Sequence, residues 1–275
     1  MSVPRGAGDR WALGAALLLS ALLLGVLLVD ALGGAPAASA SVAASASPAA
    51  VPGRTGTRPA VLSTRVIGHS VNGHPIRVWE LGDRAAAVTA VAIGSQHGNE
   101  AAGRVVLDAL RDGRPVHDVH LWVIPRANPD GVLRGQRQNA RGVDLNRNFP
   151  RHWKPMTGYD YSGRRPASEP ETRSLMRFLD RVDPDYLVSM HTPLYGLDVS
   201  HAKDRRFARR LSTQLRLPDK RLRCSGRCHG TLSQWFNHGH RGACVTVEFG
   251  SSPRSQYLTV RAPRGLVRAF GGTRG

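Results

Sequence analysis

Short apolar runs alternate with segments of helical periodicity along most of this chain. β-Branched and other apolar residues fill four runs that we predict as buried strands, at residues 88–94, 121–125, 185–190 and 243–249. Apolar positions recur at helical spacing in four other segments, residues 101–110, 171–180, 207–215 and 231–237. A hairpin turned at Asn72–Gly73 is predicted over residues 66–79. This alternation predicts an α/β fold in which helices cover both faces of a mixed, mainly parallel central sheet.

The start of the chain has a different pattern. Residues 11–29 are apolar and uncharged, and Arg5 and Arg10 precede them. We therefore predict that residues 1–32 are a signal peptide or an uncleaved membrane anchor. Positive charge on the short N-terminal side places the remaining chain outside the cytoplasm under either interpretation. The expected location is secreted or attached to the outer face of the cytoplasmic membrane, with membrane contact only through this segment.

Composition sets the other boundaries. Residues 33–61 are rich in Ala, Ser and Pro and hold almost no large apolar side chain, so we predict a disordered linker. Residues 62–265 suit a single domain with one core, and residues 266–275 are expected to form a flexible C-terminal tail.

Two histidines and a glutamate follow predicted strands. His97 and Glu100 come just after the run 88–94, at the junction with the next predicted helix, and His191 ends the run 185–190. The carboxyl ends of parallel strands meet at one edge of a sheet, so these side chains are expected to lie close together. Two histidines and one glutamate form a ligand set of catalytic zinc sites. The sequence therefore predicts one bound Zn²⁺ ion.

Two further motifs follow the same order as in a known family. Asp144-Leu145-Asn146-Arg147-Asn148-Phe149 precedes His191, and Glu248 lies in the last predicted strand. With His97 and Glu100, these motifs resemble the zinc carboxypeptidase family over roughly residues 62 to 262. The resemblance implies a zinc carboxypeptidase-like fold and a zinc ion that keeps one position open for water.

The resemblance also implies roles for individual residues. Glu248 matches the general base, and Asn146 and Arg147 match the pair that binds a free carboxylate of the substrate. Arg137 is the best match to the arginine that stabilises the oxyanion, with Arg134 and Arg141 as competitors. The mobile tyrosine of the digestive enzymes has no counterpart, since no tyrosine lies between Tyr195 and Tyr257. Tyr195, four residues after His191, could line the pocket or serve only in packing.

The cysteines are few. Cys224 and Cys228 lie close together, and an exported domain is oxidising territory, so we expect them to form a disulfide. A second zinc site built on Cys224, Cys228 and His229 is disfavoured, because it lacks a suitable fourth ligand. Cys244 falls in the last predicted strand and is expected to be a small buried residue.

The formal net charge of +18 comes mainly from scattered arginines. A solvated surface and attraction to an anionic matrix or to carboxylate-rich substrates are both open interpretations. The chain shows no basic platform interleaved with aromatic residues and no known nucleic-acid motif, so no nucleic-acid partner is expected.

Together these features predict an exported zinc metallopeptidase that hydrolyses an amide bond next to a residue with a free carboxylate. The chain most resembles the bacterial murein-peptide amidase branch, whose members cleave the γ-D-glutamyl–diaminopimelate bond, so a murein peptide is the expected partner. A metallocarboxypeptidase for ordinary L-peptides and a zinc-dependent deacylase of N-acyl amino acids remain alternatives. A non-enzymatic wall-binding protein is disfavoured because all three ligands and the base are retained. We expect a monomer.

Overall fold

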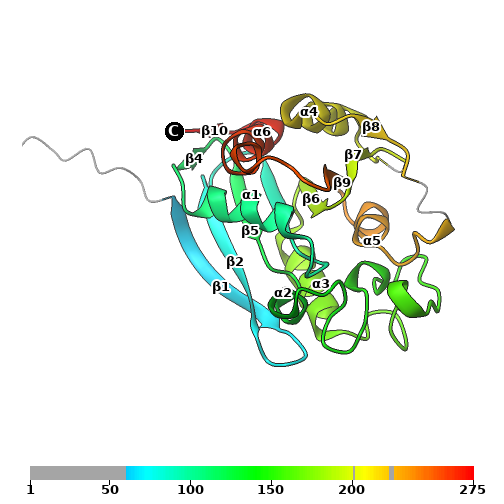
Figure 1. The fold of residues 1–275 in the computed structure, drawn as a ribbon. Helices are drawn as coiled ribbons and strands as arrows, with labels where there is room; N and C mark the ends of the chain where they lie inside the picture. The colour runs from blue at the N-terminus through cyan, green and yellow to red at the C-terminus, as the bar shows by residue number, and fades with distance from the viewer. Residues whose placement is uncertain (1–59, 201, 223–225) are drawn as a thin grey trace, which may run out of the picture. The chain divides into compact units, whose positions relative to one another are not determined.

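The structure is a computed structural model that describes residues 60–200, 202–222 and 226–275. An eight-stranded sheet forms the centre of this part of the chain (Figure 1). In spatial order the strands are β1 (Val61–His69), β2 (Pro75–Gly82), β5 (His120–Ile124), β3 (Thr89–Ile93), β6 (Tyr186–His191), β9 (Ala243–Gly250), β7 (Leu194–Asp198) and β8 (Asp219–Lys220). A separate short pair joins β4 (Val116–His117) to β10 (Thr273–Arg274).

The centre of the sheet is parallel and its flanks contain antiparallel pairs. Strands β5, β3, β6 and β9 pair in parallel, and β7 and β8 form a further parallel pair. The pairs β1–β2, β2–β5 and β7–β9 are antiparallel. The four predicted buried strands are therefore the four central strands, and the predicted mixed, mainly parallel sheet is confirmed.

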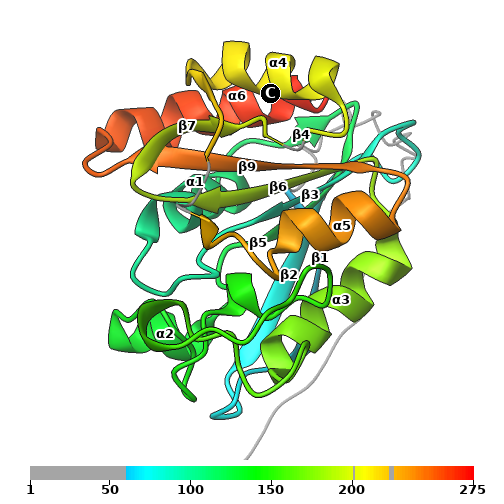
Figure 2. The same ribbon diagram turned by 90° about the vertical axis from the view of Figure 1, so that its right-hand side faces the viewer.

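Helices cover both faces, as Figure 2 shows. On one face lie α1 (Ala101–Arg111), α4 (Arg205–Leu215) and α6 (Ala262–Ala269), and on the other α3 (Pro170–Val182) and α5 (Leu232–Gly239). Side chains of successive strand residues point to opposite faces, so β3 sends Ala90 and Ala92 to the first core and Val91 and Ile93 to the second. A strand covered on both faces is apolar at nearly every position, which explains the continuous apolar runs in the sequence.

Shorter elements connect the layers. They are α2 (Pro129–Arg134), the 3₁₀ turns η1 (Leu145–Arg147) and η2 (Gly158–Asp160), and the π-helical turn η4 (Tyr257–Arg261). Asn128 caps α2 by accepting a hydrogen bond from the Gly131 N–H, and Pro129 occupies the first helical position.

Glycine allows close packing at the turn between β3 and α1. A Cβ on Gly98 would lie 1.9 Å from the carbonyl carbon of Gly131, and one on Gly103 would lie 2.6 Å from the Cβ of Met190. Any larger residue would push this turn away from α2 and the start of α1 away from β6. The two glycines thus set where His97 and Glu100 lie relative to His191.

The C-terminal segment is not the flexible tail that we predicted for residues 266–275. Leu266 and Phe270 are buried in the core beside α1 and α4, and β10 pairs with β4. The amphipathic spacing of α6 begins at Ala262, so the predicted boundary fell inside a helix whose apolar face closes one core.

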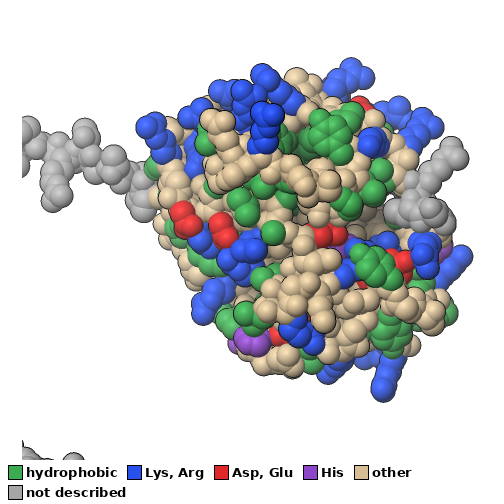
Figure 3. Space-filling view, viewed as in Figure 1, with side chains coloured by type: hydrophobic (Ala, Val, Ile, Leu, Met, Phe, Trp, Pro, Cys, Tyr) green, Lys and Arg blue, Asp and Glu red, His purple; other side chains and the backbone are tan. Residues whose placement is uncertain are grey.

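The predicted signal or anchor and most of the predicted linker lie outside the described residues. Within residues 60–200, 202–222 and 226–275, no helix is long and apolar enough to cross a membrane. Figure 3 shows basic side chains spread over the visible face with few acidic ones among them, in keeping with a scattered arginine excess.

Candidate active site

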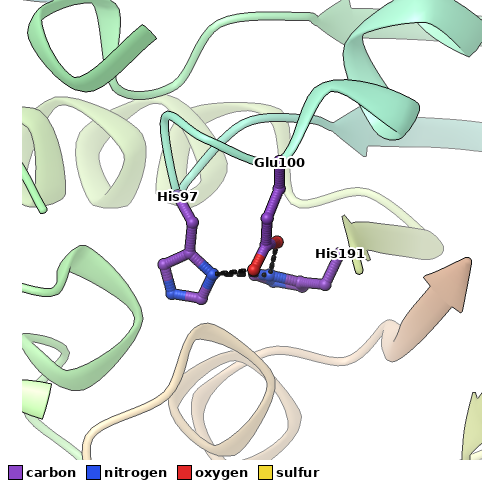
Figure 4. A group of neighbouring side chains, drawn as sticks. All are labelled: His97, Glu100 and His191. Carbon is purple, nitrogen blue, oxygen red and sulfur yellow. Dashed lines mark hydrogen bonds and ion pairs between the residues drawn. The ribbon is translucent and has the colours of Figure 1, made fainter. Parts of the chain in front are cut away.

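Three side chains from two neighbouring strands meet at the carboxyl edge of the sheet. His97 and Glu100 follow β3, and His191 is the last residue of β6, which pairs directly with β3. One oxygen of Glu100 lies 2.8 Å from Nδ1 of His97 and the other 2.9 Å from Nδ1 of His191. All three side chains are buried, and Figure 4 shows both imidazoles turned toward the carboxylate. The predicted convergence of the three residues is confirmed.

The outer nitrogen of each imidazole has its own partner. Nε2 of His97 lies 2.9 Å from a carboxylate oxygen of Asp144, which is fully buried, and Nε2 of His191 lies 2.9 Å from the Ser189 hydroxyl. When His97 is neutral and Asp144 accepts its Nε2–H, the lone pair of the imidazole is on Nδ1 and is available to a metal ion. That lone pair faces a Glu100 oxygen and the Nδ1 of His191, which is 3.2 Å away.

This arrangement favours positive charge at its centre. Burial alone would lower the pKa of His97, but the carboxylates of Asp144 and Glu100 outweigh it and raise that pKa to about 9. Burial would raise the pKa of Glu100, but His97 and His191 hold it well below its ordinary value. Two carboxylates around one imidazole thus create a site that a proton or a metal ion can satisfy.

The donor set fits zinc. The potential ligand atoms of His97, Glu100 and His191 all lie within 4.8 Å of one another. Two imidazole nitrogens and one carboxylate oxygen are a ligand set of catalytic zinc, and hydrogen bonds to the outer imidazole nitrogens fix the orientation of such ligands.

Asp144 also orients the neighbouring arginine. Its second oxygen accepts hydrogen bonds from Nε and Nη2 of Arg137, at 2.9 and 2.7 Å. We call His97, Glu100 and His191 together the metal cluster. The Nη1 atom of Arg137 lies beside this cluster, 3.5 Å from a Glu100 oxygen. Arg137 therefore lies at the site, whereas Arg134 and Arg141 are exposed and line no part of the pocket that holds the metal cluster.

Glu248 lies beside the cluster on the next strand. It pairs with His191 in the register of β9 and β6, and its side chain is largely buried, with one oxygen 3.3 Å from the Leu194 N–H. Burial raises the pKa of Glu248, and the nearby charge of Glu100 raises it further, while His191 opposes the shift. A higher pKa brings this carboxylate closer to the range in which it can exchange protons near neutral pH.

Asn146 and Arg147 occupy the turn η1 in the wall of the same pocket. The Asn146 side-chain oxygen accepts from the Leu232 N–H at 3.0 Å, and its amide nitrogen lies 3.5 Å from Nε2 of His191. Arg147 is buried and lies 3.4 Å from the carboxylate of Asp160, while its Nε makes no hydrogen bond within the described residues. Asp160 also lies 3.3 Å from Nε of Arg227.

One cavity of about 830 Å³ brings these residues together. The predicted site residues that line it are His97, Glu100, Arg137, Asn146, Arg147, His191 and Glu248. Tyr195 does not line this cavity, and lies instead in a neighbouring hollow of about 780 Å³. The tyrosine at the site is Tyr159, whose ring stacks on the Arg137 guanidinium at 4.6 Å.

Two site acids and this tyrosine went unassigned in the sequence. Asp144 lies two residues before Asn146, in a motif that the sequence analysis had identified. A histidine that binds a metal usually donates its second ring N–H to a carboxylate or carbonyl group, so Asp144 could have been assigned as that acceptor. Tyr159 and Asp160 lie in an irregular polar loop, where no periodicity marks them.

The cysteines are only partly described. Cys228 is disulfide-bonded, and Cys244 is a free, buried thiol in β9. Cys224, the predicted partner of Cys228, lies outside the described residues.

The zinc carboxypeptidase family matches this chain over residues 54–197, just over half of its length. This chain belongs to the zinc carboxypeptidase family. Family membership makes it a zinc-dependent metallopeptidase, and the His97, Glu100 and His191 group fits that metal. Glu248 lies beyond the matched residues, so its position in the structure is what connects it to the site.

Two curated relatives are murein peptide amidases. Murein peptide amidase A of Escherichia coli is 37% identical over 146 residues, which cover 48% of this chain and 60% of that protein. The match thus spans less than two thirds of that relative. Murein peptide amidase A of Vibrio campbellii is 30% identical over 209 residues, covering 70% of this chain and 81% of that protein.

Solved structures show the same architecture. The crystal structure of murein-tripeptide amidase MpaA from Escherichia coli aligns with a TM-score of 0.62 and 27% identity, covering 75% of this chain and 91% of that chain. Carboxypeptidase A from Helicoverpa armigera aligns with a TM-score of 0.64 over 77% of this chain and 69% of that chain. At 14% identity the second match shows the shared fold alone.

Removing one imidazole tests the metal cluster. In the variant His191→Ala we expect zinc content after exhaustive dialysis to fall well below one ion per chain, because one of three protein ligands is lost. Metal analysis by mass spectrometry measures this. The matched control is His238→Ala, which removes an exposed histidine and should leave zinc content unchanged. Full zinc occupancy in His191→Ala would remove that residue from the ligand set.

Proposed function

We propose that this protein is an exported peptidase with one zinc ion that hydrolyses the amide bond next to a residue with a free carboxylate in murein peptides. The observation that carries the proposal is that one cavity holds the metal cluster, the buried carboxylate of Glu248 and the guanidinium of Arg147. These groups are the parts that hydrolysis of such a bond requires.

The chemistry divides between the bound metal ion and two side chains, Glu248 and Arg137. Zinc, when held by His97, Glu100 and His191, supplies an activated water and a Lewis acid for the substrate carbonyl. Glu248 takes a proton from the attacking water and returns it to the amine that leaves, which needs a carboxylate with a raised pKa. Arg137, held in place by Asp144, is available to stabilise negative charge that develops on the carbonyl oxygen.

Arg147 binds the free carboxylate of the substrate. Its guanidinium is buried in the pocket wall and has an N–H without a partner among the described residues, so it can receive a carboxylate with a fork of donors. Asn146 adds an amide donor beside it. Asp160 keeps Arg147 and Arg227 on the same side of the pocket, since both lie within 3.4 Å of its carboxylate.

Murein peptides are the substrate class that we favour. The two curated relatives described above are murein peptide amidases, and five arginines line the pocket against four carboxylates, two of which serve as metal ligand and base. In the γ-D-glutamyl–diaminopimelate linkage, a free carboxylate adjoins the scissile amide and would meet Asn146 and Arg147. Export belongs to the proposal through the predicted N-terminal segment, which lies outside the described residues.

Replacing the base tests the mechanism. In Glu248→Gln we expect zinc content to stay at the wild-type level while kcat falls by about 10²- to 10⁴-fold, because the proton acceptor is lost and the shape is kept. Steady-state hydrolysis of a γ-D-glutamyl–diaminopimelate peptide measures kcat. Asp112→Asn, at an exposed position, serves as the control. Unchanged turnover in Glu248→Gln would exclude it as the base.

Replacing the carboxylate-binding arginine tests the substrate class. In Arg147→Ala we expect kcat/KM to fall by about 10- to 100-fold for a substrate with a free carboxylate beside the scissile bond, because a charge-assisted interaction is lost. The same substrate amidated at that carboxylate should be hydrolysed poorly by the wild-type protein and by the variant, and its kcat/KM should differ little between them. Arg141→Ala, which removes an exposed arginine away from the pocket, is the control. Equal losses on both substrates would contradict this role.

A further inference from the structure

Part of the pocket wall has no role in the chemistry described so far. This wall is formed by the end of β7, the residues after it, the segment that follows β8 and the start of α4. Its polar and charged members, which we call the distal wall, are Asp198, Ser200, Arg205 and Arg221.

Strand register connects the distal wall to the catalytic centre. Thr246 precedes Glu248 by two residues on β9, so both side chains lie on the same face of the sheet, and both line the pocket. Asp198 on β7 is the direct register partner of Thr246. The distal wall therefore begins about 7 Å along the strand from Glu248, within the reach of a long substrate side chain.

Asp198 is held rigidly but keeps one free acceptor. Its Oδ1 accepts hydrogen bonds from the backbone N–H groups of Ser200 and Leu222, at 2.9 and 3.3 Å. Its Oδ2 accepts none from the described residues. The hydroxyl of Ser200 is buried and likewise has no hydrogen-bond partner within the described residues. A buried polar atom without a partner is costly, so the Ser200 hydroxyl, next to the half-buried carboxylate of Asp198, indicates that a polar ligand completes the wall.

Two arginines line the same wall of the pocket as this carboxylate. The hydrogen bonds from Val199 N–H to the Lys220 carbonyl and from Leu222 N–H to Asp198 place Arg221 next to Asp198. Arg205 is the first residue of α4. Neither arginine forms an ion pair within the part of the chain that the structure describes, and both line the pocket. The distal wall thus offers an anionic acceptor and cationic donors to one pocket.

We propose that the distal wall binds the far end of a substrate side chain that carries its own ammonium and carboxylate groups, as in diaminopimelate. Asp198 and the Ser200 hydroxyl bind the ammonium, and Arg221 and Arg205 bind the carboxylate. The inference rests on the proposed function, in which Arg147 binds the carboxylate next to the scissile bond. It adds a specificity site that separates such a residue from lysine, which lacks the far carboxylate.

Three substrates with one acyl group test this site. They are γ-D-glutamyl amides of meso-diaminopimelate, of L-lysine, which lacks the far carboxylate, and of L-2-aminopimelate, which lacks the far ammonium. The zinc-loaded wild-type protein should show a kcat/KM for the diaminopimelate substrate about 10- to 100-fold above the other two, because each analogue leaves one charged group of the wall unpaired.

Two variants assign the wall residues. Asp198→Asn should lower kcat/KM by about 10- to 100-fold on the diaminopimelate substrate and leave the aminopimelate substrate unchanged, because only the former carries the ammonium. Arg221→Gln should lower kcat/KM on the diaminopimelate and aminopimelate substrates, which carry the far carboxylate, and leave kcat/KM on the lysine substrate unchanged. Arg206→Gln, a neighbouring exposed arginine that does not line the pocket, should change none of the three.

Each contrary result has a distinct meaning. Equal losses on all three substrates in Asp198→Asn would show that Asp198 only supports its loop, and would overturn the inference. Equal kcat/KM values of the wild-type protein for all three would overturn the inference and leave the proposed function intact. Hydrolysis of none of them by the zinc-loaded protein would overturn the proposed function itself. Arg221 is exposed, and its side chain forms no hydrogen bond or ion pair with another residue that the structure describes, so its variant gives a result even if Asp198→Asn fails to fold.

Discussion

The pairing of β3 with β6 is the constraint on which the site depends. Parallel neighbours end at the same edge of a sheet, so residues that follow β3 and the last residue of β6 must meet, although they are more than ninety positions apart in the chain. Gly98 and Gly103 then allow the turn and the start of α1 to pack closely enough for the Glu100 carboxylate to lie between the two histidines. Because β9 is the next parallel strand, the same edge also receives Glu248.

Around this edge, charge is arranged in opposing pairs. Asp144 contacts both His97 and Arg137, so one buried carboxylate fixes the orientation of an imidazole in the metal cluster and of the guanidinium that we assign to the reacting carbonyl. Asp160 does the same for Arg147 and Arg227 on the side of the pocket assigned to the substrate carboxylate. A strongly basic chain thus uses its few buried acids to position specific arginines.

The sequence predicted the central strands and the hairpin of β1 and β2 at one edge well, and the C-terminal segment and the loops around the pocket poorly. The four central strands are apolar at almost every position because both faces are covered, and this pattern can be recognised without a structure. The convergence of His97, Glu100 and His191 could be predicted because each lies at or just after the end of such a strand. The C-terminal helix α6 was missed as part of the domain, since its apolar face is meaningful only against α1 and α4. Tyr159, Asp160 and Asp198 could not be assigned, because their roles come from contacts between distant loops and strand ends that leave no periodic signal.

The central claim is that His97, Glu100 and His191 share one zinc ion through two imidazole nitrogens and a carboxylate oxygen. X-ray absorption at the zinc edge on the purified, zinc-loaded protein tests this claim most directly. The account predicts one zinc per chain in a first shell of nitrogen and oxygen atoms only, at about 2.0–2.2 Å, with the scattering pattern of two imidazoles. A shell that contains sulfur at about 2.3 Å, or the pattern of no imidazole, would place the metal elsewhere and contradict the account.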